Sequence, residues 1–168
     1  MRSISIVIPA YNEEKRLPGT LDAVLRFVKS RDWDEVEVLV VNDGSRDGTA
    51  ELVRSYARDH SEVRLLENPG NRGKGYSVRH GMLEAKGEWR LFTDADLSAP
   101  IEELPKLFEA AQREDAEIVI GSRALDRSLI GVHQSAFRET AGRFFNLLVQ
   151  LGTGLRLWDT QCGFKLFR

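Results

Sequence analysis

Two aspartates, Asp94 and Asp96, follow an apolar run with only Ala95 between them. In an extended chain both side chains leave the same face, about 7 Å apart, and a small bend would bring them onto one ion. Carboxylate oxygens without nearby Cys or His suit Mg²⁺ or Mn²⁺, which proteins hold by one or two carboxylates while substrate phosphates and water complete the coordination. The alternative is a helix cap near Ile101 or a solvated loop, and for an isolated D-x-D motif that alternative is favoured.

A second carboxylate, Asp43, stands at the end of another apolar run and is followed by Gly44 and Ser45. From such a position a carboxylate can accept hydrogen bonds from the ribose or base of a nucleotide. Asp, Gly and Ser are also favoured turn residues, so taken alone this segment is better explained as a turn.

The segment NPGNRGKG (68–75) resembles a phosphate-binding loop. It is not a P-loop, because Tyr76 follows Gly75, and it is not a dinucleotide-binding loop, because Val78 replaces the third glycine. Arg72 and Lys74 at the start of a helix fit an anion site and a surface loop equally well. Neither an NTPase nor a dehydrogenase is indicated.

Composition favours one globular domain over residues 1–168, with 42% hydrophobic and 30% charged residues. A net charge of -2 lacks the basic excess of a nucleic-acid-binding protein. Cys162 is the only cysteine, which excludes an intrachain disulfide and fits a cytoplasmic protein. The sequence has no uninterrupted apolar stretch of the roughly 20 residues that would cross a bilayer, and it gives no signal of oligomeric state.

Strands and helices are expected to alternate along the chain. Near-continuous apolar runs predict buried strands, and apolar residues at helical spacing predict helices between them. The fold class is therefore α/β, with an open, mostly parallel sheet and helices on both faces, and ligands should bind beyond the carboxyl ends of the strands. The predicted strands are 4–8, 36–41, 63–66, 89–93 and 117–120; the predicted helices are 17–28, a segment around 52–57 capped at Asp47 or Thr49, a segment from 76 to about 87, and 101–113.

Six segments, taken in order, carry a family resemblance. They resemble the family-2 glycosyltransferases of the GT-A fold, and are most similar to the polyprenyl- or dolichyl-phosphate β-glucosyltransferases and then to the dolichyl-phosphate mannose synthases. The likeness covers residues 3–168. The segments are SIVIPAYNEE, VVNDGSRDGT, NRGKGYSVRHGM, LFTDADLS, GSR and DTQCGFKLFR.

The resemblance implies a role for each matching residue. Asp94 and Asp96 would hold the divalent ion, Asp43 would meet the base, and Arg138 with Lys165 would bind the acceptor phosphate. Asp159 and Arg138 are the implied catalytic residues. The implied nucleotide-sugar pocket consists of Pro9, Ala10, Tyr11, Glu13, Asp43, Lys74, Asp94, Ala95, Asp96 and Arg123.

The resemblance also implies the reaction, an inverting transfer of a hexose from a nucleotide sugar to a polyprenyl phosphate. Glucose and UDP-glucose are favoured, because Ser98 stands where mannose-transferring relatives commonly have Gln. Asn42 departs from the two aspartates of many relatives. A phosphate acceptor is largely dianionic at neutral pH and needs no strong base, whereas a saccharide hydroxyl would require one, for which Asp159 is the candidate.

Two other functions remain open. A non-catalytic nucleotide-sugar-binding module has the same fold requirements. A nucleotidyltransferase is disfavoured, because its first loop should be basic and here it reads PAYNEE.

The end of the chain carries its own expectations. Because family members continue beyond the motif that ends at Arg168, we expect a catalytic core truncated at its C-terminus. Residues 137–158 predict a helix that packs on the sheet, with a membrane-surface helix as the alternative. Peripheral contact with the cytoplasmic face of a membrane follows from a lipid acceptor.

Overall fold

The computed structural model describes residues 3–122, 154 and 162–168. It divides into two compact units, one of residues 1–119 with 164–168 and one of residues 120–163. The elements below belong to the first unit, except that the last residue of one short strand falls in the second. The prediction of a single truncated domain stays a prediction, and so does the helix at 137–158, which lies outside the described residues.

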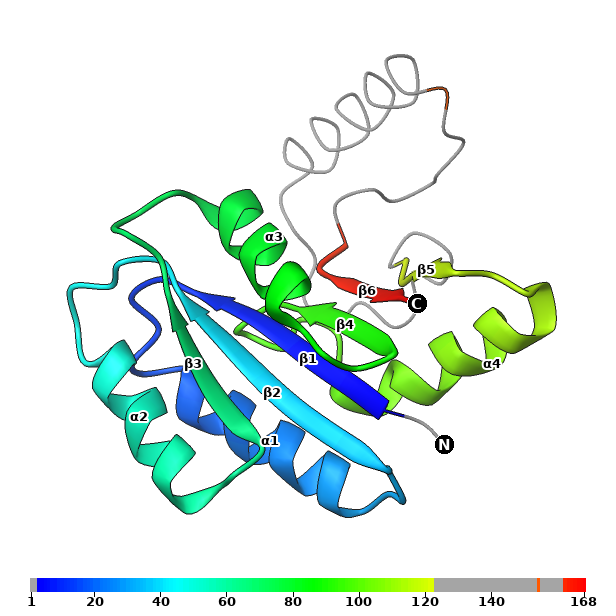
Figure 1. Cartoon of the computed structure of the whole chain (residues 1–168), viewed down its shortest axis with the longest axis horizontal. Helices are drawn as coiled ribbons and strands as arrows, with labels where there is room; N and C mark the ends of the chain where they lie inside the picture. Colours follow the sequence, from blue (N-terminus) through cyan, green and yellow to red (C-terminus); the bar gives the residue numbers. More distant parts are fainter. Residues whose placement is uncertain (1–2, 123–153, 155–161) are drawn as a thin grey trace. The chain divides into compact units, whose positions relative to one another are not determined.

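A six-stranded sheet forms the centre of the first unit (Figure 1). Its strand order is β3-β2-β1-β4-β6-β5, in which β1, β2, β3 and β4 are parallel and β6 runs antiparallel to β4. The predicted open, mostly parallel sheet is therefore confirmed. The strands are β1 (Ser3–Ala10), β2 (Glu35–Asn42), β3 (Val63–Glu67), β4 (Trp89–Thr93), β5 (Ile118–Ile120) and β6 (Phe164–Phe167).

Helices cover both faces of this sheet, as predicted. Figure 1 shows α3 on one face and α1 and α2 on the other. Trp33 and Trp89 both place their rings against Phe108 of α4, with centroids 5.7 and 5.3 Å apart. The helices are α1 (Leu17–Lys29), α2 (Thr49–Asp59), α3 (Lys74–Glu84), the 3₁₀ turn η1 (Ile101–Glu103) and α4 (Leu104–Glu114).

Several boundaries differ from the predictions by one to three residues, and the third helix begins at Lys74 rather than at Tyr76. The third helix ends at Glu84 rather than near Gly87, the fourth opens with the 3₁₀ turn before Pro105, and the fifth strand begins at 118 rather than 117. The N-cap of α2 is Gly48, although Asp47 Oδ1 still accepts a hydrogen bond from the Thr49 amide. Such shifts arise because the end of an element depends on local hydrogen bonds that periodicity does not encode.

The order in which the chain adds strands to the sheet changes direction between β1 and β4, which are themselves parallel. From β1 the chain moves outward to β2 and β3, and it then returns to place β4 on the other side of β1. Open α/β sheets bind ligands at this switch point, beyond the carboxyl ends of the strands. The fold therefore directs attention to the loops that follow β1 and β4.

Candidate nucleotide-sugar site

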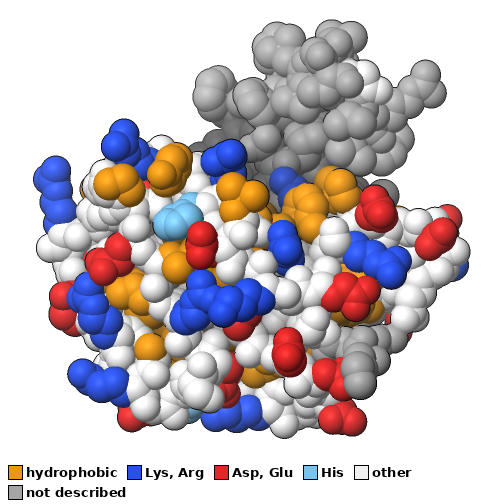
Figure 2. Space-filling model, in the orientation of Figure 1, with side chains coloured by type: hydrophobic (Ala, Val, Ile, Leu, Met, Phe, Trp, Pro, Cys, Tyr) orange, Lys and Arg blue, Asp and Glu red, His pale blue; other side chains and the backbone are white. Residues whose placement is uncertain are grey.

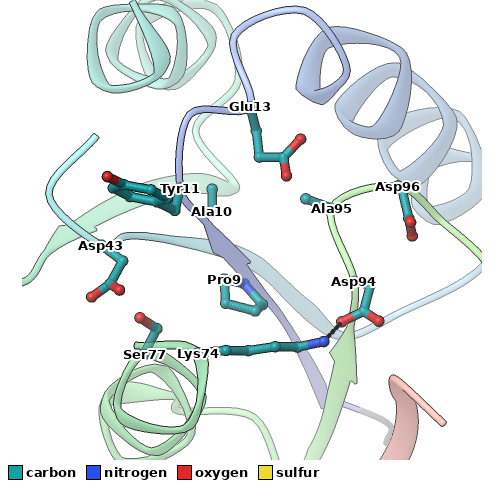
Figure 3. A pocket seen from close by; sticks show the side chains of 10 residues that line it. All are labelled: Pro9, Ala10, Tyr11, Glu13, Asp43, Lys74, Ser77, Asp94, Ala95 and Asp96. Atoms are coloured by element: carbon teal, nitrogen blue, oxygen red, sulfur yellow. Dashed lines mark ion pairs between the residues drawn. The ribbon is translucent and has the colours of Figure 1, made fainter. Parts of the chain in front are cut away.

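A cavity of about 230 Å³ lies at this switch point (Figure 3). The loop after β1, the end of β2, the start of α3 and the loop after β4 all contribute to its wall. Ser77 is the one lining residue that the sequence did not predict, and helical periodicity on α3 could have placed it beside Lys74. The lining residues are Pro9, Ala10, Tyr11, Glu13, Asp43, Lys74, Ser77, Asp94, Ala95 and Asp96.

Lys165 is the one other predicted site residue that the structure describes, and it is not among the residues that line the cavity. Arg123, Arg138 and Asp159 lie outside the described residues, so their roles stay predictions. Lys165 is on β6, directly opposite Phe92 of β4. Directly opposed residues of an antiparallel pair share one face of the sheet, so Lys165 lies on the face that carries Phe92.

The loops after β1 and β2 are held together by hydrogen bonds between them. The Asn12 amide donates to Ser45 Oγ at 3.0 Å, and the Arg46 amide donates to Asn12 Oδ1 at 2.8 Å. Asn12 adopts a left-handed backbone conformation with a φ of 56°, which asparagine tolerates better than most residues. Glu13, next along the loop, is fixed by the Thr49 hydroxyl, which accepts a hydrogen bond from its amide at 2.9 Å. This bracing keeps the cavity wall in one conformation.

The paired aspartates lie in a tight turn rather than on an extended strand. β4 ends at Thr93, and the Leu97 amide closes the turn on the Asp94 carbonyl at 3.1 Å. Leu97 has a φ of 46°, an unfavourable conformation for a leucine, and strain of this kind gathers at functional loops. The Thr20 hydroxyl of α1 donates to the Ala95 carbonyl at 2.5 Å and anchors the turn. The expected small bend is therefore a full turn, and both side chains reach the cavity wall.

Asp94 and Asp96 have different surroundings. Asp94 Oδ1 is buried and accepts no well-oriented hydrogen bond in the described part of the chain, but the Lys74 ammonium lies 2.7 Å from it. Asp96 Oδ1 accepts hydrogen bonds from the amide and hydroxyl of Ser98. Burial raises the pKa of Asp96, but the Ser98 hydrogen bonds and the nearby Arg16 outweigh it and lower the pKa overall. Neither aspartate caps η1, whose N-cap has no side-chain hydrogen bond.

This donor set fits a divalent ion. A buried carboxylate oxygen of Asp94 faces a cation, the Asp96 carboxylate lines the same cavity, and hard oxygen ligands suit Mg²⁺ or Mn²⁺. Within the described ranges no three His, Cys, Asp or Glu side chains cluster as a metal site made by protein alone. Two carboxylates completed by substrate phosphate oxygens and water are the arrangement that remains.

Asp43 is buried at the cavity edge, where its carboxylate organises the loop between β3 and α3. Oδ1 accepts hydrogen bonds from Asn68 Nδ2 at 2.7 Å and the Arg72 amide at 2.9 Å, and Oδ2 accepts one from the Gly73 amide at 2.7 Å. Burial raises the pKa of Asp43, but these hydrogen bonds together lower it below the usual value. Asn68 was not predicted as a site residue; its position directly after the third strand is the signal that could have revealed it.

Positive charge on the visible face of the molecule is not gathered in one patch. Figure 2 shows Lys and Arg side chains interspersed with Asp and Glu. Separately, no helix in the described part of the chain has the length and apolar character that crossing a membrane requires.

Solved structures with a similar fold include glycosyltransferases. A mannosyltransferase from Pyrobaculum calidifontis, in complex with GDP-Man and Mn²⁺, is 27% identical; the match has a TM-score of 0.59 and covers 71% of this chain and 35% of that one. Glucosyl-3-phosphoglycerate synthase from Mycobacterium tuberculosis, in complex with Mn²⁺ and UDP-glucose, is 22% identical; that match has a TM-score of 0.67 and covers 99% of this chain and 56% of that one. The second likeness shows the fold alone, and it confirms the predicted GT-A fold.

Curated relatives agree at the level of sequence. Dolichyl-phosphate beta-glucosyltransferase of Drosophila melanogaster is 42% identical over 176 residues, which cover 98% of this chain and 54% of the relative. The chain spans about half the length of the curated relatives it matches. The family model described as "Glycosyl transferase family 2" matches residues 5–168. The chain belongs to glycosyl transferase family 2.

Proposed function

We propose that this chain carries the donor-binding part of an inverting glycosyltransferase that moves glucose from UDP-glucose to dolichyl phosphate or another polyprenyl phosphate. The supporting observation is the convergence of Asp94, Asp96 and Lys74 in one cavity at the switch point of the sheet. The name shared by the curated relatives favours the glucosyl group and the lipid phosphate.

The reaction is a single displacement. An oxygen of the acceptor phosphate forms a bond to the anomeric carbon while the bond to the nucleoside diphosphate breaks, so no enzyme-linked intermediate forms. Asp94 and Asp96 would hold a divalent ion, which when bound supplies Lewis-acid stabilisation of the leaving diphosphate. Lys74 contributes a positive charge at the start of α3, where the helix dipole also favours an anion.

The acceptor side of the reaction depends on cations more than on a base. A phosphate monoester has a second pKa of about 6, so it is largely ionised at neutral pH. Arg138 is the proposed bidentate ligand of that phosphate, and Lys165 adds a point charge from the face of the sheet that carries Phe92. A saccharide hydroxyl as acceptor would instead require Asp159 as general base.

The function is tested by nucleoside diphosphate release. The chain is incubated with Mn²⁺, a short polyprenyl phosphate and UDP-glucose, GDP-mannose or UDP-N-acetylglucosamine in turn. We expect UDP release with UDP-glucose only, dependent on both the acceptor and the metal. Asp96→Ala should reduce the rate by at least about a hundredfold, in line with the loss of other charge-stabilising groups. Asp59→Ala, at an exposed position at the end of α2, is the matched control and should keep the rate.

Other outcomes assign a different function. UDP binding without release from any of the three donors would favour a non-catalytic nucleotide-sugar-binding module. Release that requires a saccharide in place of the polyprenyl phosphate would show that the acceptor is a hydroxyl group.

A further inference from the structure

The Lys74 side chain lies across the cavity and reaches the end of β4. Figure 3 shows its ion pair with Asp94, in which the ammonium is 2.7 Å from Oδ1. The ammonium also lies 5.5 Å from the centroid of the Phe92 ring. Lys74 is the first residue of α3, and 59% of its side chain is exposed. The contact therefore joins a fixed, partly buried carboxylate to the end of a flexible stem that has room to move.

Asp94 depends on this cation more than the other cavity carboxylates do. Glu13 is bound by both Nε and Nη2 of Arg16, and the oxygens of Asp43 accept hydrogen bonds from the loop before α3. Asp96 accepts two from Ser98. Asp94 Oδ1 has the Lys74 ammonium and no well-oriented hydrogen bond among the described residues.

The charges of the cavity create a conflict when a diphosphate enters. Among the described residues, the lining side chains include four carboxylates and a single ammonium, that of Lys74. If Lys74 turned to the diphosphate, Asp94 would lose its compensating charge beside another anion. If Lys74 stayed on Asp94, the diphosphate would meet a negative wall.

We propose that Lys74 is an exchangeable cation that occupies Asp94 before the divalent ion arrives and moves to the donor diphosphate when the ion takes its place. The proposal rests on the proposed function, because it assumes a diphosphate donor. Its consequence is that metal alone must displace the ammonium and binds weakly, whereas metal and nucleotide promote each other's binding. By thermodynamic reciprocity the two effects on affinity are equal.

The test measures binding and needs no turnover. Mn²⁺ is titrated calorimetrically into the wild-type chain, Lys74→Met, Lys74→Arg and Lys86→Met without nucleotide, and UDP is then titrated with Mn²⁺ saturating. We expect Lys74→Met to bind Mn²⁺ alone about five- to tenfold more tightly than wild type, and to bind UDP more weakly by a similar factor. Lys74→Arg keeps the charge and should stay near wild type. Lys86→Met removes an exposed lysine outside the cavity lining and should change neither affinity.

The opposite sign of the two changes is what the proposal requires. Mn²⁺ affinity of Lys74→Met that equals or falls below the wild-type value, or is undetectable, would overturn it, and so would unchanged UDP affinity. If Lys74→Met binds Mn²⁺ more tightly and UDP more weakly but the wild-type chain transfers no sugar, the proposed function is wrong and the exchange of Lys74 between Asp94 and the diphosphate stands.

Discussion

The Asp43 carboxylate accepts hydrogen bonds from Asn68 and from the amides of Arg72 and Gly73. Asn68 is itself held by His80, whose Nδ1 lies 2.8 Å from Asn68 Oδ1 and must be the donor there, because a carbonyl oxygen only accepts. Gly44, with a φ of 70°, brings the chain so close to Gly70 that any side chain would collide with its backbone. One carboxylate and one glycine thus fix the loop that leads into Lys74.

Replacing Asp43 by Asn should destabilise the fold in a pH-dependent way. The neutral carbonyl oxygen of Asn is a weaker acceptor than a carboxylate oxygen, and its NH₂ group would face an N–H donor of Arg72 or Gly73. We expect the free energy of unfolding to fall by about 1–3 kcal/mol at pH 7. The pKa of Asp43 in the folded chain lies below its ordinary value of 3.8, so in acid the unfolded chain binds more protons than the folded one. The stability that the ionised carboxylate contributes is therefore present above pH 3.8 and is lost as the pH falls below it. The difference in unfolding free energy between wild type and Asp43→Asn should therefore shrink from about pH 6 to about pH 3.

Urea unfolding across this pH series is the measurement. Asp59→Asn, at an exposed position, is the control and should show little difference at any pH. A wild-type-to-Asp43→Asn difference that stays constant with pH would contradict the assigned hydrogen bonds.

The α3 helix carries Lys74 and Ser77 into the cavity because it sits very close to the sheet. Its buried residues are Ser77 and Gly81, and a Cβ added at Gly81 would overlap the methyl groups of Val7 on β1 and Val41 on β2. At Gly75, the second residue of the same helix, an added Cβ would meet nothing within 4 Å. A small residue is therefore required on the inner face of α3 and not on its outer face.

These two glycines give a matched pair of substitutions. Gly81→Ala should destabilise the protein by about 1–3 kcal/mol, because overpacking pushes the helix away from β1 and β2. Gly75→Ala removes freedom from the unfolded chain without a clash and should be neutral or stabilise by up to about 1 kcal/mol. Chemical denaturation of the two variants gives both values, and equal effects would mean that α3 is not seated as described.

Much of the molecule follows from local sequence patterns, and the rest depends on long-range pairing. Apolar runs predicted β1 to β4 because a strand buried on both faces is apolar at nearly every position. No local pattern, however, places β6 antiparallel to β4, between β4 and β5. Most of the described cavity lining was implied by the family resemblance, and these residues lie mainly at the carboxyl ends of parallel strands, which meet at one edge of the sheet. The hydrogen bonds to the Asp43 carboxylate were not predicted, because most of their donors are backbone amides, which nearly every residue has.

The whole molecule should report metal and nucleotide binding through its thermal stability. UDP alone should raise Tm only slightly, because the described lining of the cavity carries four carboxylates against one ammonium. Mn²⁺ alone should also raise it only slightly, because it must displace the Lys74 ammonium from Asp94. Together, at about a hundredfold excess over the dissociation constant, they should stabilise the fold by about 2.7 kcal/mol. For a chain of this size that corresponds to a Tm increase of about 5–10 °C, measured by differential scanning calorimetry. Addition of EDTA should reverse the increase while UDP is still present, and an increase that survives EDTA would mean that the nucleotide binds without the ion at Asp94 and Asp96.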